Sequence, residues 1–333
     1  MMAGCNGRGG RRWPDIAGVS NLSGRRPLVA LLMLLFMLPS AMAQVSMTPA
    51  YLDHFDAQKR KVVLRNGLSL AYLDLGARDD RPVILIHGYT DSARDWAPIA
   101  RLLTPHLRLI IIDLRGHGIS AKPDCCYTRF DFAEDVKLLM DSLHIASADV
   151  VGHSLGSIVA QTFAELWPDA IRRLVLISST GTSFGATESP AACASNRPTV
   201  AGWLASVEQL SDPIDPESSF MRGWWAESIR VNPAYFSRRQ RRDAAAIPAH
   251  IWRAVADQTL VGVDLRYMLP RIYASTLLIW GELDALADDT GREALRAGIA
   301  HAEVRTFAAV GHDLFWEDPA AVAAALIDFL AAG

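Results

Sequence analysis

The sequence has 333 residues, enough to bury a large hydrophobic core as one large domain or two ordinary ones. Half of the residues are apolar and 21% are charged, which is typical of a soluble globular protein. The 33 basic residues are balanced by 36 acidic ones, so the composition argues against a nucleic-acid-binding surface.

The first 43 residues have the pattern of a signal peptide. Arginines precede an unbroken apolar run over residues 28–38, and Ala41 and Ala43 are the small residues that a signal peptidase accepts. The run is shorter than the roughly 20 residues that a membrane-spanning helix needs. We therefore expect export to the periplasm or the medium, cleavage after residue 43 and no membrane anchor in the mature chain.

Three cysteines remain after that leader: Cys125, Cys126 and Cys193. An odd number allows at most one intramolecular disulfide, and export exposes the chain to an oxidising compartment. We expect Cys193 to pair with Cys125 or Cys126. Because no cysteine or histidine cluster has the spacing of metal ligands, we expect no structural zinc.

From residue 61 onward, strand and helix signals alternate, which predicts a largely parallel sheet with helices on both faces. Segments 61–65 and 68–74 flank Asn66-Gly67, a two-residue hairpin signal, so the sheet is expected to begin with an antiparallel pair. Continuous apolar runs predict five further buried strands, over residues 83–86, 109–112, 150–151, 174–177 and 277–280. Residues 304–307 are expected to form a shorter last strand.

Helices are expected between the strands. Apolar residues recur with helical spacing behind Thr128, and Asp131 stands three residues further on, as in a capping box. Residues 155–167 and 319–330 are predicted to form two further helices.

The segment Gly152-His153-Ser154-Leu155-Gly156 lies between a predicted strand and a predicted helix, where a G-x-S-x-G nucleophile elbow belongs. A tight turn there forces the serine into strained backbone angles, and the two glycines leave room for it. The pattern predicts that Ser154 is a nucleophile and that the N–H of Leu155 is one oxyanion donor. The alternative is a glycine-rich helix start that Ser154 merely caps.

A second oxyanion donor is expected from the loop after the strand that ends at Ile86. There the N–H of Tyr89 follows Gly88, which lets the backbone turn inward. We interpret His87 as a residue that braces this loop. Residues 113–118, with two glycines after a buried strand, are interpreted as a structural turn.

Residues 183–268 contain no convincing strand signal and are rich in proline, arginine and aromatic residues. This predicts a helical cap inserted into a core domain that spans residues 44–182 and 269–333. Apolar and aromatic side chains are common in ligand pockets, so four tryptophans of the cap are candidates for lining a substrate pocket. They are Trp203, Trp224, Trp225 and Trp252, and packing inside the cap is the alternative for each.

A serine needs a base to become a good nucleophile. His312 follows Gly311 directly after the last predicted strand, at the edge where open α/β sheets gather their sites. An acid between Ser154 and His312 in the chain would hold the imidazole in the correct tautomer. Asp284, just after the strand over residues 277–280, is our candidate. Glu282 and Asp288 remain alternatives.

With these residues the chain resembles the α/β-hydrolase superfamily, and within it the capped branch that includes carboxylesterases and lactonases. The resemblance covers residues 61–330 and rests on four segments. They are His87-Gly88-Tyr89, residues 113–120, residues 152–156, and Gly311-His312 with Asp284 before it. It implies cleavage of an ester or lactone, with an apolar or aromatic small molecule as substrate and without a cofactor or metal.

Departures from related families narrow this expectation. Epoxide hydrolases and haloalkane dehalogenases of this branch carry an aspartate where this chain has Ser154. The glycine-rich patterns of ring-cleavage carbon–carbon hydrolases are absent around Gly88 and Gly152. Two alternatives stay open: amide or thioester cleavage by the same three residues, and a small-molecule sensor built on the same scaffold.

Overall fold

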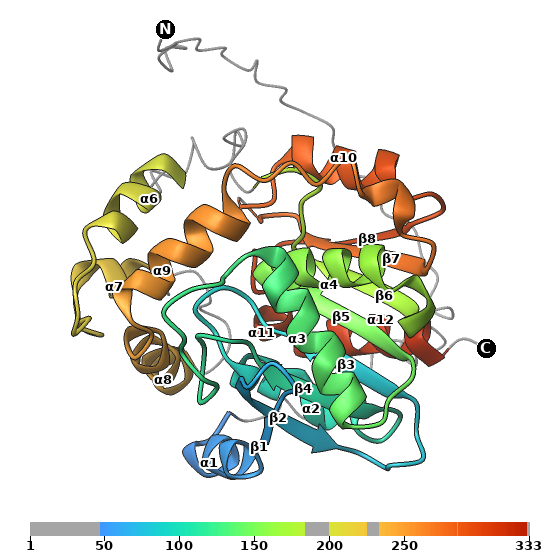
Figure 1. Ribbon diagram of the computed structural model, residues 1–333, viewed down its shortest axis with the longest axis horizontal. Helices are drawn as coiled ribbons and strands as arrows, with labels where there is room; N and C mark the ends of the chain where they lie inside the picture. The colour runs from blue at the N-terminus through green and yellow to red at the C-terminus, as the bar shows by residue number, and fades with distance from the viewer. Residues whose placement is uncertain (1–46, 184–199, 225–232, 285, 332–333) are drawn as a thin grey trace, which may run out of the picture. The chain divides into compact units, whose positions relative to one another are not determined.

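The computed structural model describes residues 47–183, 200–224, 233–284 and 286–331 (Figure 1). The expected signal peptide, Trp225 and Cys193 therefore lie outside the described residues. Within those ranges, no helix is both long enough and apolar enough to cross a membrane.

The core of the protein is one eight-stranded sheet, as the sequence predicts. The strands are β1 (Arg60–Val63), β2 (Ser69–Leu75), β3 (Pro82–Ile86), β4 (Arg108–Asp113), β5 (Ala148–His153), β6 (Ile171–Ile177), β7 (Ser275–Gly281) and β8 (Glu303–Phe307). Their spatial order is β1-β2-β4-β3-β5-β6-β7-β8.

The direction of the strands explains where a site can form. β2 pairs antiparallel with both β1 and β4, and the predicted hairpin turns at Gly67, whose φ is 84°. All other neighbours are parallel, so the carboxyl ends of β3 to β8 meet at one edge. Loops that leave this edge are the expected place for a ligand or a reaction.

Helices of the core cover both faces of the sheet. They are α1 (Pro49–Ala57), α2 (Ala97–Leu103), α3 (Arg129–Ser142), α4 (Leu155–Leu166), α10 (Asp289–Gly298), α11 (Leu314–Glu317) and α12 (Pro319–Ala331). Figure 1 shows α3 and α4 in front of the sheet and α12 behind it. The predicted capping box starts α3: the Asp131 side chain accepts a hydrogen bond from Thr128 N at 2.9 Å, and Thr128 Oγ1 accepts one from Asp131 N at 3.3 Å.

The described part of the insertion is helical, as predicted, and contains no strand. Its helices are α6 (Val200–Glu208), α7 (Ser219–Trp224), α8 (Pro233–Ala245) and α9 (Ala249–Val255), followed by a single π-helical turn, η3 (Ala256–Leu260). The Tyr89 hydroxyl donates a hydrogen bond to the carbonyl oxygen of Trp252 at 2.6 Å, so the core loop and the cap are directly joined.

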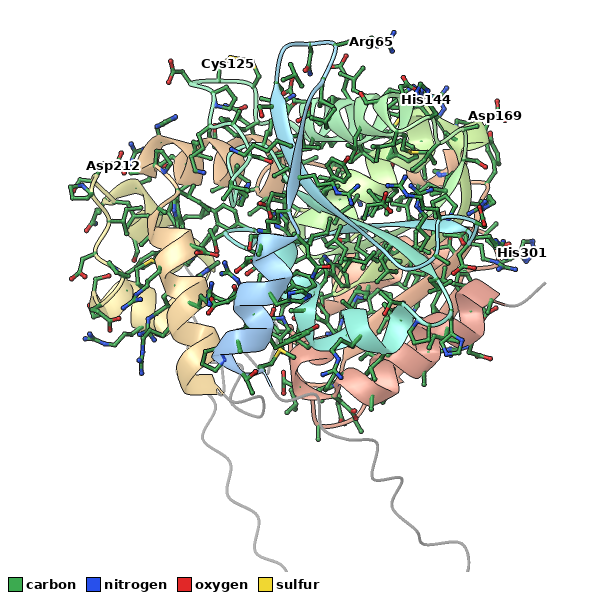
Figure 2. All side chains as sticks on the ribbon, turned by 90° about the horizontal axis from the view of Figure 1, so that it is seen from below. Arg65, Cys125, His144, Asp169, Asp212 and His301 are labelled. Carbon is green, nitrogen blue, oxygen red and sulfur yellow. A yellow bond between two sulfur atoms is a disulfide. The ribbon has the colours of Figure 1, made fainter. Side chains whose placement is uncertain are left out.

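The structure corrects the expected disulfide. Cys125 and Cys126 are bonded to each other, in the loop before α3 that Figure 2 shows at the edge of the molecule. The prediction that one of them pairs with Cys193 is therefore wrong. Neighbouring residues are already close, with Cα atoms 3.8 Å apart. Their bond closes no long loop. A bond to Cys193 would close a long loop and therefore cost more conformational entropy of the chain.

Candidate active site

Ser154 occupies a strained turn between β5 and α4. Its backbone angles are φ 50° and ψ −117°, in a region that residues other than glycine rarely adopt. A Cβ on Gly152 would lie 2.2 Å from the Gly156 carbonyl oxygen, and a Cβ on Gly156 would lie 2.2 Å from that of Ile86. Both positions therefore exclude any side chain, which is the physical reason for the G-x-S-x-G pattern here.

The loop that holds Tyr89 lies beside this turn. A Cβ on Gly88 would be only 3.0 Å from Nδ1 of His153, and the start of α4 packs against the end of β3 through Gly156. Leu155 is the first residue of α4, where backbone N–H groups have no partner within the helix. The structure thus brings together the two backbone segments on which the oxyanion donors are predicted.

His312 and Asp284 are joined by a hydrogen bond. Nδ1 of His312 lies 2.9 Å from Oδ1 of Asp284, whose oxygen also accepts hydrogen bonds from the backbone N–H groups of Leu286 and Ala287. The two alternative acids have other roles. Glu282 accepts a hydrogen bond from Ala309 N, and Asp288 accepts one from Gly291 N at the start of α10.

Close packing of the strand ends holds His312 against His153, the residue before Ser154. A Cβ on Gly281, at the end of β7, would lie 2.2 Å from the Gly311 carbonyl oxygen. The carbonyl oxygen of His312 accepts hydrogen bonds from Ser178 Oγ at 2.7 Å and from His153 Nε2 at 3.0 Å. The imidazole rings of His312 and His153 have centroids 5.0 Å apart. His312 therefore lies against the residue that precedes Ser154.

The electrostatics of Asp284 are set by two opposing effects. Burial of the carboxyl group acts to raise its pKa, but the His312 ring, the two backbone hydrogen bonds and Arg292 outweigh burial and hold the pKa well below its usual range. Asp284 is therefore ionised at neutral pH and able to stabilise a positive charge on the imidazole beside it.

His87 and Asp113 have the structural contacts that the sequence analysis expected of them. Nε2 of His87 accepts a hydrogen bond from Leu114 N at 3.0 Å, and burial together with the neighbouring His117 lowers the pKa of His87 to about 3. Asp113 accepts hydrogen bonds from the backbone N–H groups of Ala93 and Ile119 and from Lys59. Both side chains tie adjacent loops together.

The sequence analysis missed a buried group of ionisable residues behind this site. Asp91, Asp95 and His153 place their ligand-type atoms within 4.8 Å of one another. Burial and neighbouring carboxylates raise the pKa of Asp91 well above its usual value, and burial raises the pKa of Asp95 to about 6. The only signal in the sequence is two aspartates four residues apart after β3, and nothing there connects them to His153.

Three tryptophans of the cap pack around Tyr89. Its ring meets those of Trp203, Trp224 and Trp252 edge-on, with centroids 5.7, 5.9 and 5.4 Å away. Trp252 is fully buried and its indole donates to the Ala244 carbonyl oxygen, so this residue belongs to the interior of the cap. The alternative of packing inside the cap therefore describes Trp252 better than a pocket role.

The other two tryptophans differ in what their indole N–H meets. Nε1 of Trp224 donates to Thr90 Oγ1 at 2.8 Å, which anchors the cap to the loop after β3. Nε1 of Trp203 is buried and has no hydrogen-bond partner among the described residues, although its ring stacks on that of Trp224. Of the three described candidates, Trp203 is the one whose indole N–H makes no hydrogen bond to a described residue.

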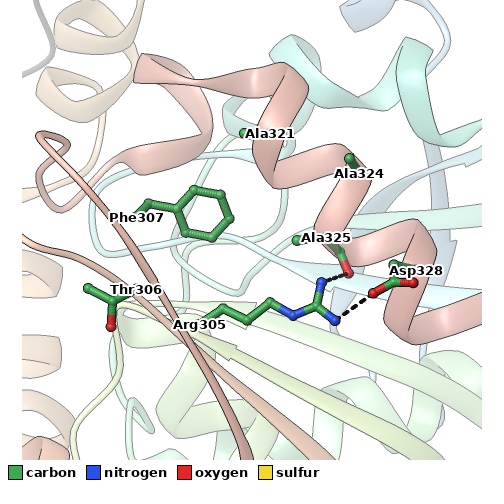
Figure 3. A pocket seen from close by; sticks show the side chains of 7 residues that line it. All are labelled: Arg305, Thr306, Phe307, Ala321, Ala324, Ala325 and Asp328. Atoms are coloured by element: carbon green, nitrogen blue, oxygen red, sulfur yellow. Dashed lines mark hydrogen bonds and ion pairs between the residues drawn. The ribbon is translucent and has the colours of Figure 1, made fainter. Parts of the chain in front are cut away.

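A hollow on the outside of the core lies away from these residues. It is formed between β8 and α12, where Arg305 reaches Asp328 and the Ala325 carbonyl oxygen beside Phe307 (Figure 3). None of its lining residues is among the predicted site residues.

Comparison with known proteins agrees with the fold. Residues 81–319 match the family model of the alpha/beta hydrolase fold. The chain is 31% identical over 255 residues to a 2-hydroxymuconate semialdehyde hydrolase of Pseudomonas sp. (strain CF600), a match that covers 75% of this chain and 87% of that protein.

Two solved structures have the same fold over nearly their whole length. One is a hydrolase from Pseudomonas aeruginosa PA01, with a TM-score of 0.67, 29% identity and coverage of 82% of this chain and 98% of that chain. The other is the enol-lactonase from Burkholderia xenovorans LB400, with a TM-score of 0.65, 24% identity and coverage of 82% and 100%. From the family match and these likenesses we conclude that this chain belongs to the α/β-hydrolase fold family.

Proposed function

We propose that this chain is a serine hydrolase that cleaves a carboxylic ester or a lactone through an acyl-enzyme intermediate. The observation that carries the proposal is the 2.9 Å hydrogen bond between Nδ1 of His312 and the ionised Asp284. It leaves Nε2 of His312 as the basic nitrogen, on a ring packed against the residue before the strained Ser154. A base oriented in this way is what a serine nucleophile requires.

The chemistry follows from these positions. As the Ser154 oxygen adds to the carbonyl carbon, His312 takes the hydroxyl proton and Asp284 stabilises the imidazolium. The N–H groups of Tyr89 and Leu155 bind the oxyanion of the tetrahedral intermediate. When the carbon–oxygen bond breaks, His312 gives the proton to the leaving alcohol. A water molecule then attacks the acyl-enzyme with the same base, releasing the acid and restoring Ser154.

The side chains of the cap favour a substrate that is apolar or aromatic and that also carries a hydrogen-bond acceptor. The edge of the site toward the cap consists of Tyr89 and the aromatic residues packed on it, and the free Trp203 N–H adds one donor. Arg94, on the loop after β3, is buried and engaged by Asp56 and Asp243, so it offers no charge to an acidic substrate. These contacts favour an uncharged ester or lactone.

A second candidate is hydrolysis of a compound such as 2-hydroxymuconate semialdehyde. It is favoured by the similarity to the hydrolase of that compound over 87% of the length of that protein. We had set aside ring-cleavage carbon–carbon hydrolases because glycine-rich patterns are missing around Gly88 and Gly152. That argument is too weak to exclude this substrate class against a match of this length.

A labelling and turnover experiment tests the proposal. The purified wild type, Ser154→Ala and Ser157→Ala are treated with a fluorophosphonate probe. They are then assayed with p-nitrophenyl esters of increasing acyl length, γ-lactones, anilides, thioesters and 2-hydroxymuconate semialdehyde. Ser157 is a matched control, because it is a buried serine one turn further along α4. We expect labelling and ester turnover in the wild type and Ser157→Ala, and neither in Ser154→Ala.

Each other outcome points to a different function. Ester turnover that survives in Ser154→Ala contradicts the assignment of the nucleophile. Labelling of Ser154 without turnover of any substrate supports a sensor on the hydrolase scaffold. Turnover of anilides, of thioesters or of the semialdehyde in place of esters keeps the three residues but replaces the substrate class.

A further inference from the structure

Behind the candidate active site, Asp91, Asp95 and His153 meet in the interior of the protein. The aspartates belong to the loop and 3-10 helix after β3 (η1, Ala93–Trp96), and His153 is the last residue of β5. Their side-chain ligand atoms all lie within 4.8 Å of one another. None of the three residues is more than 4% exposed. The group is therefore shielded from solvent on all sides.

The hydrogen bond of His153 determines what its other nitrogen can be. Nε2 lies 3.0 Å from the carbonyl oxygen of His312, and a carbonyl oxygen only accepts, so Nε2 carries a hydrogen. Asp313 Oδ1, 3.8 Å away on the same side, also favours a hydrogen on Nε2. In a neutral imidazole Nδ1 then carries a lone pair, and this nitrogen faces the two aspartates.

When the two carboxyl groups are ionised, the groups that face one another are thus all acceptors. Nδ1 of His153 is 3.7 Å from Oδ2 of Asp95, which is too long for a hydrogen bond. Nδ1 and both oxygens of Asp95 have no hydrogen-bond partner among the described residues. A lone pair and buried ionised carboxylates in contact repel one another unless a proton or a metal cation lies between them.

The neighbouring side chains do not supply that charge. Arg94 stands between the two aspartates in sequence, but its guanidinium is engaged by Asp56 and Asp243. The amide of Gln240 donates to Asp91 Oδ1 at 3.4 Å and is neutral. The three residues therefore form a buried, ligand-rich group for which the described side chains supply no positive partner when its carboxyl groups are ionised.

We propose that Asp91, Asp95 and His153 bind one divalent transition-metal cation of the zinc type. One imidazole nitrogen and two carboxylates are a ligand set that suits Zn²⁺. Ligand atoms around a tetrahedral zinc lie about 3.3 Å apart, so side chains whose ligand atoms are now within 4.8 Å of one another need to close by up to about 1.5 Å. His153 already donates its other N–H to a backbone carbonyl, as metal-bound histidines usually do.

This position gives the cation an indirect connection to the candidate active site. The carbonyl oxygen that His153 holds is that of His312, so a cation that fixes His153 also fixes the loop carrying His312. In this role the three ligands position a neighbouring residue and do not touch the substrate. The inference does not depend on the proposed function, because metal content and thermal stability test it without an activity assay.

The mature chain is first stripped of metal with a chelator, then incubated with equimolar ZnCl₂ and desalted. The zinc that stays bound is measured. We expect about one zinc per wild-type chain by inductively coupled plasma mass spectrometry, and a higher Tm than for the stripped protein. Asp95→Asn is expected to retain less than about a tenth of that zinc and to lose the Tm shift. Two controls should bind as the wild type does. Asp149→Asn makes the same change at a different fully buried carboxylate, which lies in β5. The double variant Cys125→Ser and Cys126→Ser removes the two sulfur atoms of the disulfide.

Equal zinc content in the wild type and Asp95→Asn overturns the proposal, as does a wild type that takes up no zinc. The latter result means that a proton, not a metal, lies between His153 and the aspartates. If Asp95→Asn does not fold, the wild type loaded with Co²⁺ decides the question. Visible d–d absorption from a nitrogen and oxygen site supports the proposal, and its absence rejects it.

Discussion

At the scale of single residues, backbone strain is concentrated at the carboxyl edge of the sheet. Thr90, Ser154 and Ser178 have φ values of 66°, 50° and 51°, although none is a glycine. Such conformations cost about 1–3 kcal/mol each and persist only where the surroundings impose them. Here neighbouring strands do so, because Ser154 N donates to Ile177 O and Ser178 N donates to Ile279 O. Strain gathered around one serine is consistent with a functional site.

The choice of Asp284 as the acid gives a sharp prediction. Asp284→Asn is expected to lower kcat for ester hydrolysis by about 10⁴-fold, because the amide favours the wrong imidazole tautomer. Glu282→Gln is the matched control, since Glu282 is two residues away and accepts a hydrogen bond from Ala309 N instead. Steady-state kinetics on both variants decides the matter. A mild Asp284→Asn together with a severe Glu282→Gln means that the wrong carboxylate has been chosen.

The dependence of kcat/KM on pH is expected to show the uptake of one proton, by the imidazole of His312. We expect kcat/KM to fall tenfold per pH unit below the range in which imidazoles take up a proton, about pH 6–7, because a protonated base cannot activate Ser154. Asp284 adds no second step, since its pKa is held well below the usual range and it stays ionised there. A pH–rate profile that is flat from pH 5 to 8, or that steepens to two protons, contradicts this assignment.

At the scale of elements, the joint between cap and core is a small set of side chains around Tyr89. Its hydroxyl bonds the backbone of α9 and its ring supports α6 and α7 through Trp203 and Trp224. The same residue is predicted to donate its backbone N–H to the oxyanion. Movement of the cap relative to the core would therefore be felt directly at the site.

Variants of two tryptophans of the cap can separate the anchoring of the cap to the core from the selection of the substrate. Trp203→Phe removes the free indole N–H and keeps a ring. It is expected to change the ratio of kcat/KM between polar and alkyl esters by between about twofold and tenfold, the value of one hydrogen bond. Trp224→Phe is expected to leave this ratio unchanged and to lower the free energy of unfolding by about 1 kcal/mol, because it loses the bond to Thr90.

Kinetics with paired esters and denaturant unfolding of both variants measure these effects. If both variants change stability and neither changes the ratio, the cap has no part in substrate choice. The assignment of Ser154 and His312 does not depend on that result.

At the scale of the whole molecule, buried neutral histidines link stability to pH. Burial, with the neighbouring His117 as a smaller contribution, lowers the pKa of His87 to about 3, and burial lowers that of His117 to about 4. The unfolded chain protonates both near pH 6.5, so it binds more protons than the folded chain below that pH. The stabilisation is therefore present above pH 6.5 and is lost as the pH falls toward 4.

His117→Phe isolates one of these two contributions. The His117 ring is fully buried, with its centroid 6.5 Å from that of the Phe132 ring, and phenylalanine is expected to fit in its place. Between pH 7.5 and 5.5 the variant should lose about 1 kcal/mol less of its unfolding free energy than the wild type does. Urea unfolding at the two pH values measures the difference. Equal losses in both proteins mean that His117 does not resist protonation in the folded state.

We also propose that residues 1–43 are a signal peptide removed on export. The basic leader, the apolar run and the small residues at Ala41 and Ala43 support this. Intact mass of the protein recovered from the periplasm or medium should correspond to a chain that begins at Gln44. Recovery of the uncleaved chain from the cytoplasm argues against the proposal.

What the sequence determined by itself is local in origin. Apolar runs specify the buried inner strands of the sheet, and Gly152 and Gly156 beside Ser154 specify the elbow, because strand burial and turn sterics act over a few residues. The position of His312 after the last strand follows from the rule that parallel strands end at one edge. These features were predictable without knowing any contact between distant segments.

Only the tertiary structure decided between groups that look alike in sequence. It joined Asp284, and not Glu282 or Asp288, to His312, and it gave Trp203 and Trp224 different partners. It also bonded Cys125 to Cys126 and gathered Asp91 and Asp95 against His153. The physical reason is common to all of these. Hydrogen bonds and charge contacts act over a few ångströms, so their partners depend on how loops from different strands pack, which no local pattern records.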